Sequence, residues 1–262
     1  MGKPPRKLSQ RLANLIPWRF RPIGITHLAV VSRSGLQVMT GPFQGMKYVR
    51  EAHGSCLPPK LLGCYERELH PVFEAYRAEP LDLVIDIGAA EGYYAVGVVY
   101  AGIAQKSIAY EAVPEGANLL REVARRNGVE NRVSVKGFCR PEDLQAELVA
   151  AVPGRTLVIV DAEGAEDVLL DPAHVPAITN ASVLVELHDF IVPGVTDRIR
   201  ERFSATHTIT RFDQQDRRIE ENLCRTWLVR QLPARYRLEI LSEKRPIPMH
   251  WFWMRPLVVE SW

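Results

Sequence analysis

The strongest indication of the fold class lies in the sequence Asp82-Leu-Val-Ile-Asp-Ile-Gly-Ala-Ala-Glu-Gly-Tyr-Tyr94. Its apolar residues predict a strand that ends near Asp86, and a turn containing Gly88 and Gly92 leads directly into a helix. Glycines let the backbone of such a turn approach a ligand closely, and the start of the following helix offers unpaired N–H groups to that ligand. The stretch therefore predicts the first strand and turn of a nucleotide-binding sheet.

Acidic residues distinguish this turn from the usual dinucleotide fingerprint. Asp86 and Glu91 would repel a pyrophosphate, but in a partly desolvated cleft they would attract an ammonium and a sulfonium group. S-adenosylmethionine carries both groups. The run Ser107-Ile-Ala-Tyr-Glu111 predicts the next strand, and its terminal Glu111 can accept hydrogen bonds from both hydroxyls of a ribose. The alternative is that Asp86 caps a helix and Glu111 is a solvated strand end.

Apolar strands alternate with helical stretches along the rest of the chain. The expected strands are 82–86, 107–111, 132–136, 156–161, 182–186, 206–212 and 249–254. The expected helices include 93–103, 114–128, 142–149 and 164–170, and an Arg/Glu-rich helical insertion is expected near 217–231. Nearly continuous apolar strands separated by helices indicate a parallel sheet covered on both faces. We therefore predict an α/β fold, Rossmann-like and doubly wound, with a mostly parallel seven-stranded sheet that binds ligands at the carboxyl ends of its strands.

The chain divides into three parts by composition and pattern. Residues 1–24 form a basic N-terminal extension, 25–79 a meander and helix packed on the core, and 80–262 the main domain. Within 25–50, short alternating runs separated by glycine-containing turns predict an antiparallel β-meander. Residues 64–79 carry apolar side chains at helical spacing.

Several of these segments resemble those of class I S-adenosylmethionine-dependent methyltransferases, specifically the FkbM-like branch. The resemblance lies in 84–94, in 110–115, in Val160-Asp-Ala-Glu-Gly-Ala-Glu166 and in Val185-Glu-Leu-His188. It implies a methyltransferase domain with S-adenosylmethionine as its cofactor, and Phe138-Cys139 beside the adenine, where the family more often has an acidic residue. The expected cofactor contacts are Asp86, Gly88, Ala90, Gly92, Tyr93, Glu111, Ala112, Phe138, Cys139 and Asp161.

The reaction itself is expected at the ends of the fourth and fifth strands. Neighbouring parallel strands would gather five polar residues in one cleft: Asp161, Glu163, Glu186, His188 and Asp189. His188 is the candidate base, because imidazole titrates near neutrality. Asp161 is the second candidate catalytic residue. Alternatively, Asp161, Glu186 and His188 bind magnesium or manganese, which would activate an acceptor hydroxyl. The structural alternatives are that Glu163 caps the 164–170 helix, that Glu186 is salt-bridged, and that His188 is merely hydrogen-bonded.

Composition agrees with a globular enzyme. The chain has 262 residues, of which 47% are hydrophobic and 24% charged, and its net charge of +2 selects no partner. Residues 1–22 are basic and lack acids, so a weak membrane contact through 8–20 is an alternative to a packing or disordered extension. No stretch has the length of a transmembrane helix and no signal peptide is recognisable, which favours a cytoplasmic protein. Four cysteines without C-x-x-C spacing are expected to be reduced.

Three classes of function are consistent with these features. O-methylation of a small molecule or sugar-containing metabolite is favoured. A nucleic-acid or protein methyltransferase is an alternative, because the N-terminus is basic and Trp251 and Trp253 could stack on bases. A nucleic-acid acceptor is disfavoured because no Asn/Asp-Pro-Pro-aromatic loop follows the fourth strand. The third alternative is a non-catalytic cofactor-binding protein.

Overall fold

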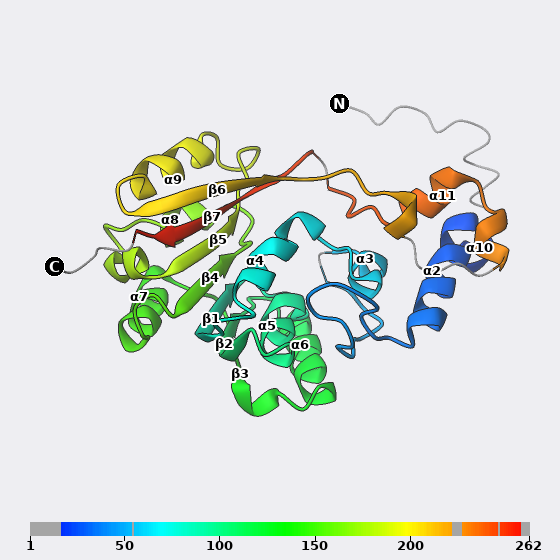
Figure 1. The fold of residues 1–262 in the computed structure, drawn as a ribbon, viewed down its shortest axis with the longest axis horizontal. Coiled ribbons are helices and arrows are strands. Elements are labelled where there is room, and N and C mark those ends of the chain that lie inside the picture. Colours follow the sequence, from blue (N-terminus) through cyan, green and yellow to red (C-terminus); the bar gives the residue numbers. More distant parts are fainter. Residues whose placement is uncertain (1–16, 54, 222–226, 246, 258–262) are drawn as a thin grey trace.

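A seven-stranded sheet forms the centre of the protein, in the order β3-β2-β1-β4-β5-β7-β6 (Figure 1). The computed structural model describes residues 17–53, 55–221, 227–245 and 247–257. The strands are β1 (Leu81–Ile87), β2 (Ala104–Tyr110), β3 (Val133–Lys136), β4 (Thr156–Val160), β5 (Ser182–Glu186), β6 (His207–Asp213) and β7 (His250–Pro256). β7 runs antiparallel to both of its neighbours, β5 and β6, and the other paired strands run parallel. The predicted Rossmann-like, mostly parallel sheet is confirmed.

Helices cover both faces of this sheet. Those described are α2 (Pro22–Ser34), α3 (Leu57–Leu62), α4 (His70–Ala75), α5 (Tyr93–Tyr100), α6 (Pro114–Arg126), α7 (Pro141–Ala150), α8 (Glu166–Leu169), α9 (Val195–Phe203), α10 (Trp227–Gln231) and α11 (Ala234–Glu239). Short 3₁₀ helices are η1 (Trp18–Phe20), η2 (Arg67–Leu69), η3 (Glu130–Arg132), η4 (Pro176–Asn180) and η5 (Ile219–Glu221). In α6, a proline at the start and the left-handed Gly128 after the end are typical helix boundaries.

Alternate residues of the strands supply the two layers of the core. In β1, Val84 packs with the buried residues of α4, α5 and α6, whereas Ile85 packs with those of α7, α8 and α9. Figure 1 shows these two groups of helices on opposite sides of the sheet. Because helices cover both faces of the sheet, the edge formed by the carboxyl ends of the strands remains accessible. The polar side chains lie at this edge.

The turn after β1 requires glycine at position 88. Gly88 has φ +85°, and a Cβ added there would lie 1.9 Å from the carbonyl oxygen of Asp161. The Gly88 and Ala89 N–H groups both donate to the Tyr110 carbonyl, at 3.0 and 3.1 Å. The turn is thereby held against the ends of β2 and β4, which brings Asp161 next to it.

The predicted β-meander over 25–50 is wrong for its first run, whereas its later two runs lie antiparallel to each other. Pro22–Ser34 forms helix α2, and the single bridge between Gln37 and Lys47 is the antiparallel pairing that the described residues show in this region. Thr26 and Val30 are buried four residues apart, which is helical spacing. Pro22 in the first helical turn and the left-handed Gly35 after the last turn mark the two ends of this helix. The apolar residues on its buried face were therefore mistaken for the alternating residues of a strand.

A long connection between β6 and β7 has its helices away from the sheet. It contains η5, α10 and α11, and the last two pack against α2, at the right of Figure 1. The helical segment predicted near 217–231 is thus confirmed in part, with 222–226 outside the described residues. Residues 1–16, and with them most of the predicted membrane-contact segment 8–20, also lie outside. None of the described helices combines the length and apolar character needed to span a membrane.

Candidate cofactor and acceptor sites

A cavity of about 420 Å³ opens at the carboxyl ends of β1, β2 and β4. Nine of the ten predicted cofactor contacts line it: Asp86, Gly88, Ala90, Tyr93, Glu111, Ala112, Phe138, Cys139 and Asp161. Small-molecule sites commonly have volumes of about 300–1,000 Å³ and a few convergent polar groups. The cavity is therefore of the size and character of a ligand site.

Asp86 is a buried carboxylate at this cavity. One of its oxygens, Oδ2, accepts a hydrogen bond from the Ala95 N–H of α5 at 2.9 Å, which orients the side chain. The residue is 2% exposed, and burial raises the pKa of Asp86 to about 7. A cationic ligand group beside it would compensate the loss of hydration that raises this pKa.

Glu111 lies at the end of β2 and is also largely buried. Its Oε2 accepts from the Ala90 N–H and its Oε1 from the Val113 N–H, both at 2.7 Å. Each carboxylate oxygen has a second lone pair, so both oxygens keep acceptor capacity for ligand hydroxyls. A Cβ at Gly116 would lie 3.1 Å from the Glu111 carboxyl carbon, so the glycine leaves room for this orientation.

Three further predicted cofactor contacts, Phe138, Cys139 and Gly92, differ in their exposure and in their position relative to the cavity. Phe138 is 68% exposed at the cavity edge, whereas Cys139 is buried and burial raises the pKa of its thiol to about 12. Gly92 does not line the cavity, contrary to expectation. A Cβ at Gly92 would lie 2.7 Å from Leu120 Cγ, so this glycine serves the packing of α6 against the turn and the left-handed start of α5.

Glu91 does not supply the second free carboxylate that the sequence indicated. It is fully buried, and Lys60 Nζ on α3 pairs with its Oε1 at 2.6 Å. The Tyr48 hydroxyl donates to the same oxygen at 2.8 Å, and the His53 N–H donates to Oε2 at 3.0 Å. The negative charge of Glu91 is therefore satisfied inside the protein, and Asp86 is the acid at this end of the cavity.

A second cavity of about 340 Å³ adjoins the first and shares Ser55, Tyr65, Asp161 and Glu163 with it. Its other lining residues are Glu186, His188, Phe190, Ile191, Glu243, Lys244, Arg245 and Met249. Four of the five polar residues expected in one cleft thus meet here. Asp189 does not, because its carboxylate turns to α9 and accepts hydrogen bonds from the backbone and hydroxyl of Thr196.

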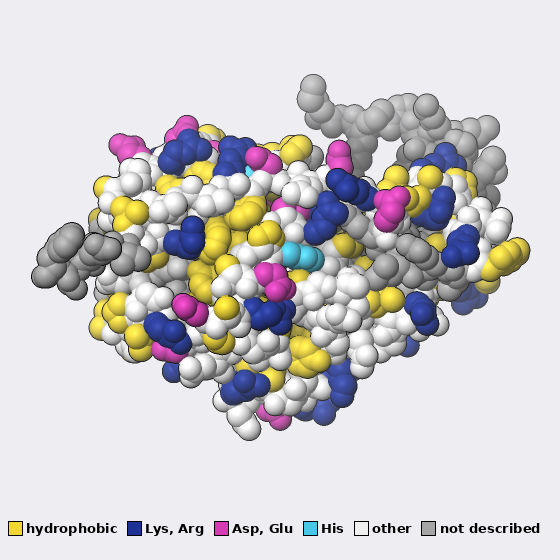
Figure 2. Space-filling model, in the orientation of Figure 1, with side chains coloured by type: hydrophobic (Ala, Val, Ile, Leu, Met, Phe, Trp, Pro, Cys, Tyr) yellow, Lys and Arg dark blue, Asp and Glu magenta, His cyan; other side chains and the backbone are white. Residues whose placement is uncertain are grey.

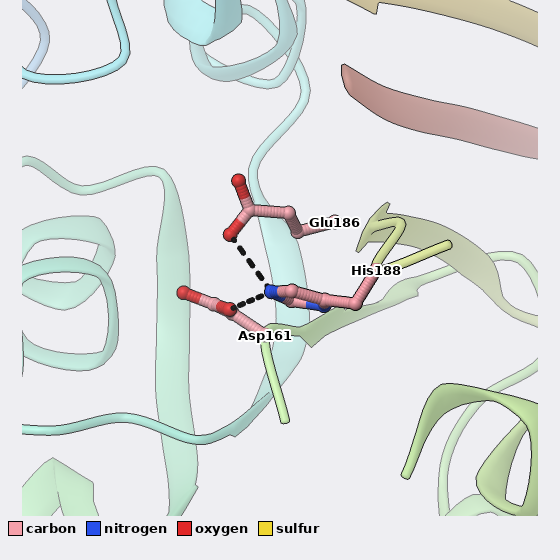
Figure 3. A group of neighbouring side chains, drawn as sticks. All are labelled: Asp161, Glu186 and His188. Carbon is pink, nitrogen blue, oxygen red and sulfur yellow. Dashed lines mark ion pairs between the residues drawn. The ribbon is translucent and has the colours of Figure 1, made fainter. Parts of the chain in front are cut away.

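His188 is held between carboxylates (Figure 3). Its Nδ1 lies 2.7 Å from Glu166 Oε1, and its Nε2 lies 3.6 Å from both Asp161 Oδ1 and Glu186 Oε2. Burial lowers the pKa of His188, but the hydrogen bond and charge of Glu166, with the charges of Asp161 and Glu163, raise it more, so the net pKa is above its ordinary value. Glu166 itself accepts from the Gly164 N–H at 2.9 Å, which fixes the position of the carboxylate.

The sequence allowed purely structural roles for two glutamates, a salt bridge for Glu186 and a helix cap for Glu163, and the structure supports the first of these roles. Glu186 is salt-bridged, since Arg245 Nη1 contacts its Oε1. Arg245 also pairs with Glu66 and with Glu243, so this guanidinium is surrounded by carboxylates. Glu163 does not cap the helix that follows it: α8 begins after Ala165 without a side-chain cap, and Glu163 is exposed at the border of the two cavities.

Three polar residues that lie at the candidate sites were missed by sequence reasoning. Lys60 lies in the apolar run Leu57–Leu62, where an isolated lysine is itself a signal of a paired, buried charge. Glu166 was quoted within a motif but given no role. Arg245 comes from the β6–β7 connection, and nothing in the sequence places that segment at the ends of β4 and β5.

The tryptophans considered for base stacking are not available for it. Trp251 is 1% and Trp253 8% exposed, and both belong to the core beside β5. On the face shown in Figure 2, lysine and arginine side chains are interspersed with acidic ones. On that face, these observations do not support a continuous nucleic-acid-binding surface.

Neither a protein-family model nor a curated protein matches the sequence. Solved structures with similar folds include the O-methyltransferase from Bacillus cereus in complex with SAH, with 12% identity, coverage of 95% of this chain and 96% of that one, and a TM-score of 0.48. An rRNA methylase from Streptococcus thermophilus has 11% identity, coverage of 73% and 98%, and a TM-score of 0.48. Cofactor-bound Rv0187 from MTB has 16% identity, coverage of 81% and 92%, and a TM-score of 0.45.

Proposed function

We propose that this protein is an S-adenosylmethionine-dependent methyltransferase of the FkbM-like branch that methylates a hydroxyl of a small or sugar-containing molecule. The observation that carries the proposal is the pair of strand-end carboxylates, Asp86 and Glu111, on one cavity, with His188 on the adjoining one. The first cavity would hold the cofactor and the second the acceptor. Asp161 borders both, at the place where a methyl group would pass between them.

The residues of the first cavity fit this cofactor. Asp86 offers a buried negative charge to the ammonium group, and Glu111 offers two oriented oxygens to the ribose hydroxyls. Gly88 allows the ligand to lie directly against the turn, and Phe138 offers an exposed ring to the adenine. The bound cofactor would supply an electrophilic methyl group.

The second cavity fits an acceptor hydroxyl. His188 is oriented by Glu166 as a catalytic histidine is oriented by a carboxylate, and in its neutral form Nε2 can accept the hydroxyl proton. Phe190 and Ile191 add partly exposed apolar surface for the body of a small molecule. Positioning of the two reactants would contribute much of the remaining rate acceleration.

A divalent cation is the second candidate for activating the acceptor. Asp161, Glu186 and His188 each offer one ligand atom, and these atoms lie within 4.8 Å of one another. The hydrogen bond from His188 Nδ1 to a carboxylate is also typical of a metal-binding histidine. Magnesium or manganese there would lower the pKa of an acceptor hydroxyl. The ion pair of Glu186 with Arg245 favours base catalysis instead, because it already occupies one carboxylate oxygen.

Transfer of a labelled methyl group tests the proposed function. The protein would be incubated with S-adenosylmethionine labelled on that methyl and with a metabolite extract treated with ribonuclease and protease. We expect the label in small molecules, as methyl ethers that are stable to alkali. Label that appears only with intact RNA or protein would instead support the alternative acceptor, and cofactor binding without any transfer would support a non-catalytic protein.

Glu111→Ala is expected to weaken binding of S-adenosylhomocysteine by about 1.5–3 kcal/mol, because charge-assisted hydrogen bonds to the ribose would be lost. Titration calorimetry measures the change. Glu115→Ala, an exposed glutamate in the first turn of α6, is the matched control and should bind normally. Unchanged affinity in a folded Glu111→Ala protein would remove Glu111 from the site.

A further inference from the structure

Lys60 is a buried cation that faces the proposed cofactor cavity. The residue is 3% exposed, yet it lines the 420 Å³ cavity together with Asp86. Its charge acts across that cavity, since Lys60 lowers the pKa of Asp86 against the larger effect of burial. A positive and a negative side chain thus line the same cavity.

The pairing with Glu91 leaves Lys60 with unused donor capacity. Glu91 receives hydrogen bonds from Lys60, Tyr48 and the His53 backbone. Lys60 donates to Glu91 at 2.6 Å and to Ser55 Oγ at 2.7 Å, which accounts for two of the three ammonium protons. The glutamate is satisfied within the protein, while no described residue accepts the third proton of the lysine, which leaves that proton for a ligand.

Aromatic rings fix the position of this ammonium group. Nζ lies 4.9 Å from the centroid of the Tyr65 ring and 5.5 Å from that of Tyr93. Both tyrosines line the same cavity. Lys60 is therefore held at the cavity wall rather than on a mobile side chain, so an anionic ligand group would bind without first ordering it.

We propose that Lys60 binds the carboxylate of the amino-acid end of the cofactor, opposite Asp86, and that Glu91 holds Lys60 in place. The inference rests on the proposed function. An α-amino acid group carries one ammonium and one carboxylate, and Asp86 and Lys60 supply the complementary charges. The pair would select ligands that retain the complete amino-acid end.

Two ligands that differ only in that end test the assignment. S-adenosylhomocysteine contains it, and 5′-methylthioadenosine keeps the nucleoside and thioether without it. Lys60→Met is combined with Glu91→Gln so that no unpaired buried charge remains. We expect the double variant to bind S-adenosylhomocysteine at least about tenfold more weakly, as for loss of a charged hydrogen bond. Its affinity for 5′-methylthioadenosine should change by less than about threefold.

Equal losses for both ligands would overturn the role of Lys60 and leave a structural ion pair. Lys106→Met, at an exposed lysine of β2, is the control.

A measurement on the unaltered protein does not depend on whether the variants fold. Decarboxylated S-adenosylmethionine should bind at least about tenfold more weakly than S-adenosylmethionine. Equal affinities would contradict the proposal. If neither S-adenosylmethionine nor S-adenosylhomocysteine binds the unaltered protein, the proposed function itself fails.

Discussion

Replacing Asp86 with asparagine is expected to abolish cofactor binding while making the ligand-free protein more stable at about pH 8. Removing one partner of a buried charge pair typically costs about 3–5 kcal/mol, so the affinity should fall by more than about a hundredfold. Without ligand, however, the Asp86 carboxylate is a buried charge with one described hydrogen bond, from Ala95. Asparagine can accept that bond without the charge.

The pH dependence of stability follows from the raised pKa. Burial raises the pKa of Asp86 to about 7, whereas an exposed aspartate titrates near about 3.9. Between these values the folded protein binds a proton that the unfolded chain has released, so the free energy of unfolding falls as the pH rises. The contribution of Asp86 to this loss is on the order of 2–4 kcal/mol and should disappear in Asp86→Asn.

Urea denaturation at about pH 5 and about pH 8, with and without S-adenosylhomocysteine, measures both effects. Asp82→Asn is a matched control on the same strand, since Asp82 forms a partly exposed ion pair with Arg155. Its effect on stability should stay below about 1 kcal/mol, and its ligand binding should be normal. An Asp86→Asn protein that binds the cofactor normally would show that Asp86 does not contact it.

His188→Ala is expected to lower turnover by about a hundredfold or more with cofactor affinity nearly unchanged, because general bases contribute on that scale. The base must be neutral, and the neighbouring Glu166, Asp161 and Glu163 raise the pKa of His188 above its ordinary value against the effect of burial. Turnover of the unaltered protein should therefore increase with pH and level off above that raised pKa. Single-turnover rates on an identified acceptor measure the effect, with the exposed His174→Ala as control.

A chelator distinguishes base catalysis from metal catalysis. If His188 acts as a base, removal of divalent cations should leave turnover unchanged. If a metal activates the acceptor, the chelator should abolish turnover, magnesium or manganese should restore it, and Asp161→Asn should be as damaging as His188→Ala. Full activity of both variants would contradict both mechanisms and leave positioning as the source of the rate.

The sheet and the turn after β1 were predictable because their signals are local. Apolar strands that end in Asp86, Glu111 and Asp161 define the sheet edge, and parallel topology brings such ends together. The helix α2 was mistaken for a meander because short apolar runs fit both periodicities. Its boundary signals, Pro22 and Gly35, were the better evidence.

The polar contacts around the site depend on long-range packing and were harder to predict. Lys60 reaches Glu91 from a helix that precedes the sheet, and Arg245 reaches Glu186 from the connection between β6 and β7. Sequence spacing gives no distance between such segments. These contacts change the predicted roles of two acids, because Glu91 and Glu186 are paired within the protein rather than free for a ligand.

Direct titration of the purified protein with S-adenosylhomocysteine, S-adenosylmethionine and NAD tests whether the first cavity is a site for this cofactor. We expect the first two ligands to bind at one site per chain and NAD not to compete, because Asp86 would repel a pyrophosphate. Glu111→Ala and Asp86→Asn should each weaken this binding. Tight binding of NAD together with no binding of S-adenosylmethionine or S-adenosylhomocysteine would contradict the assignment of the cavity.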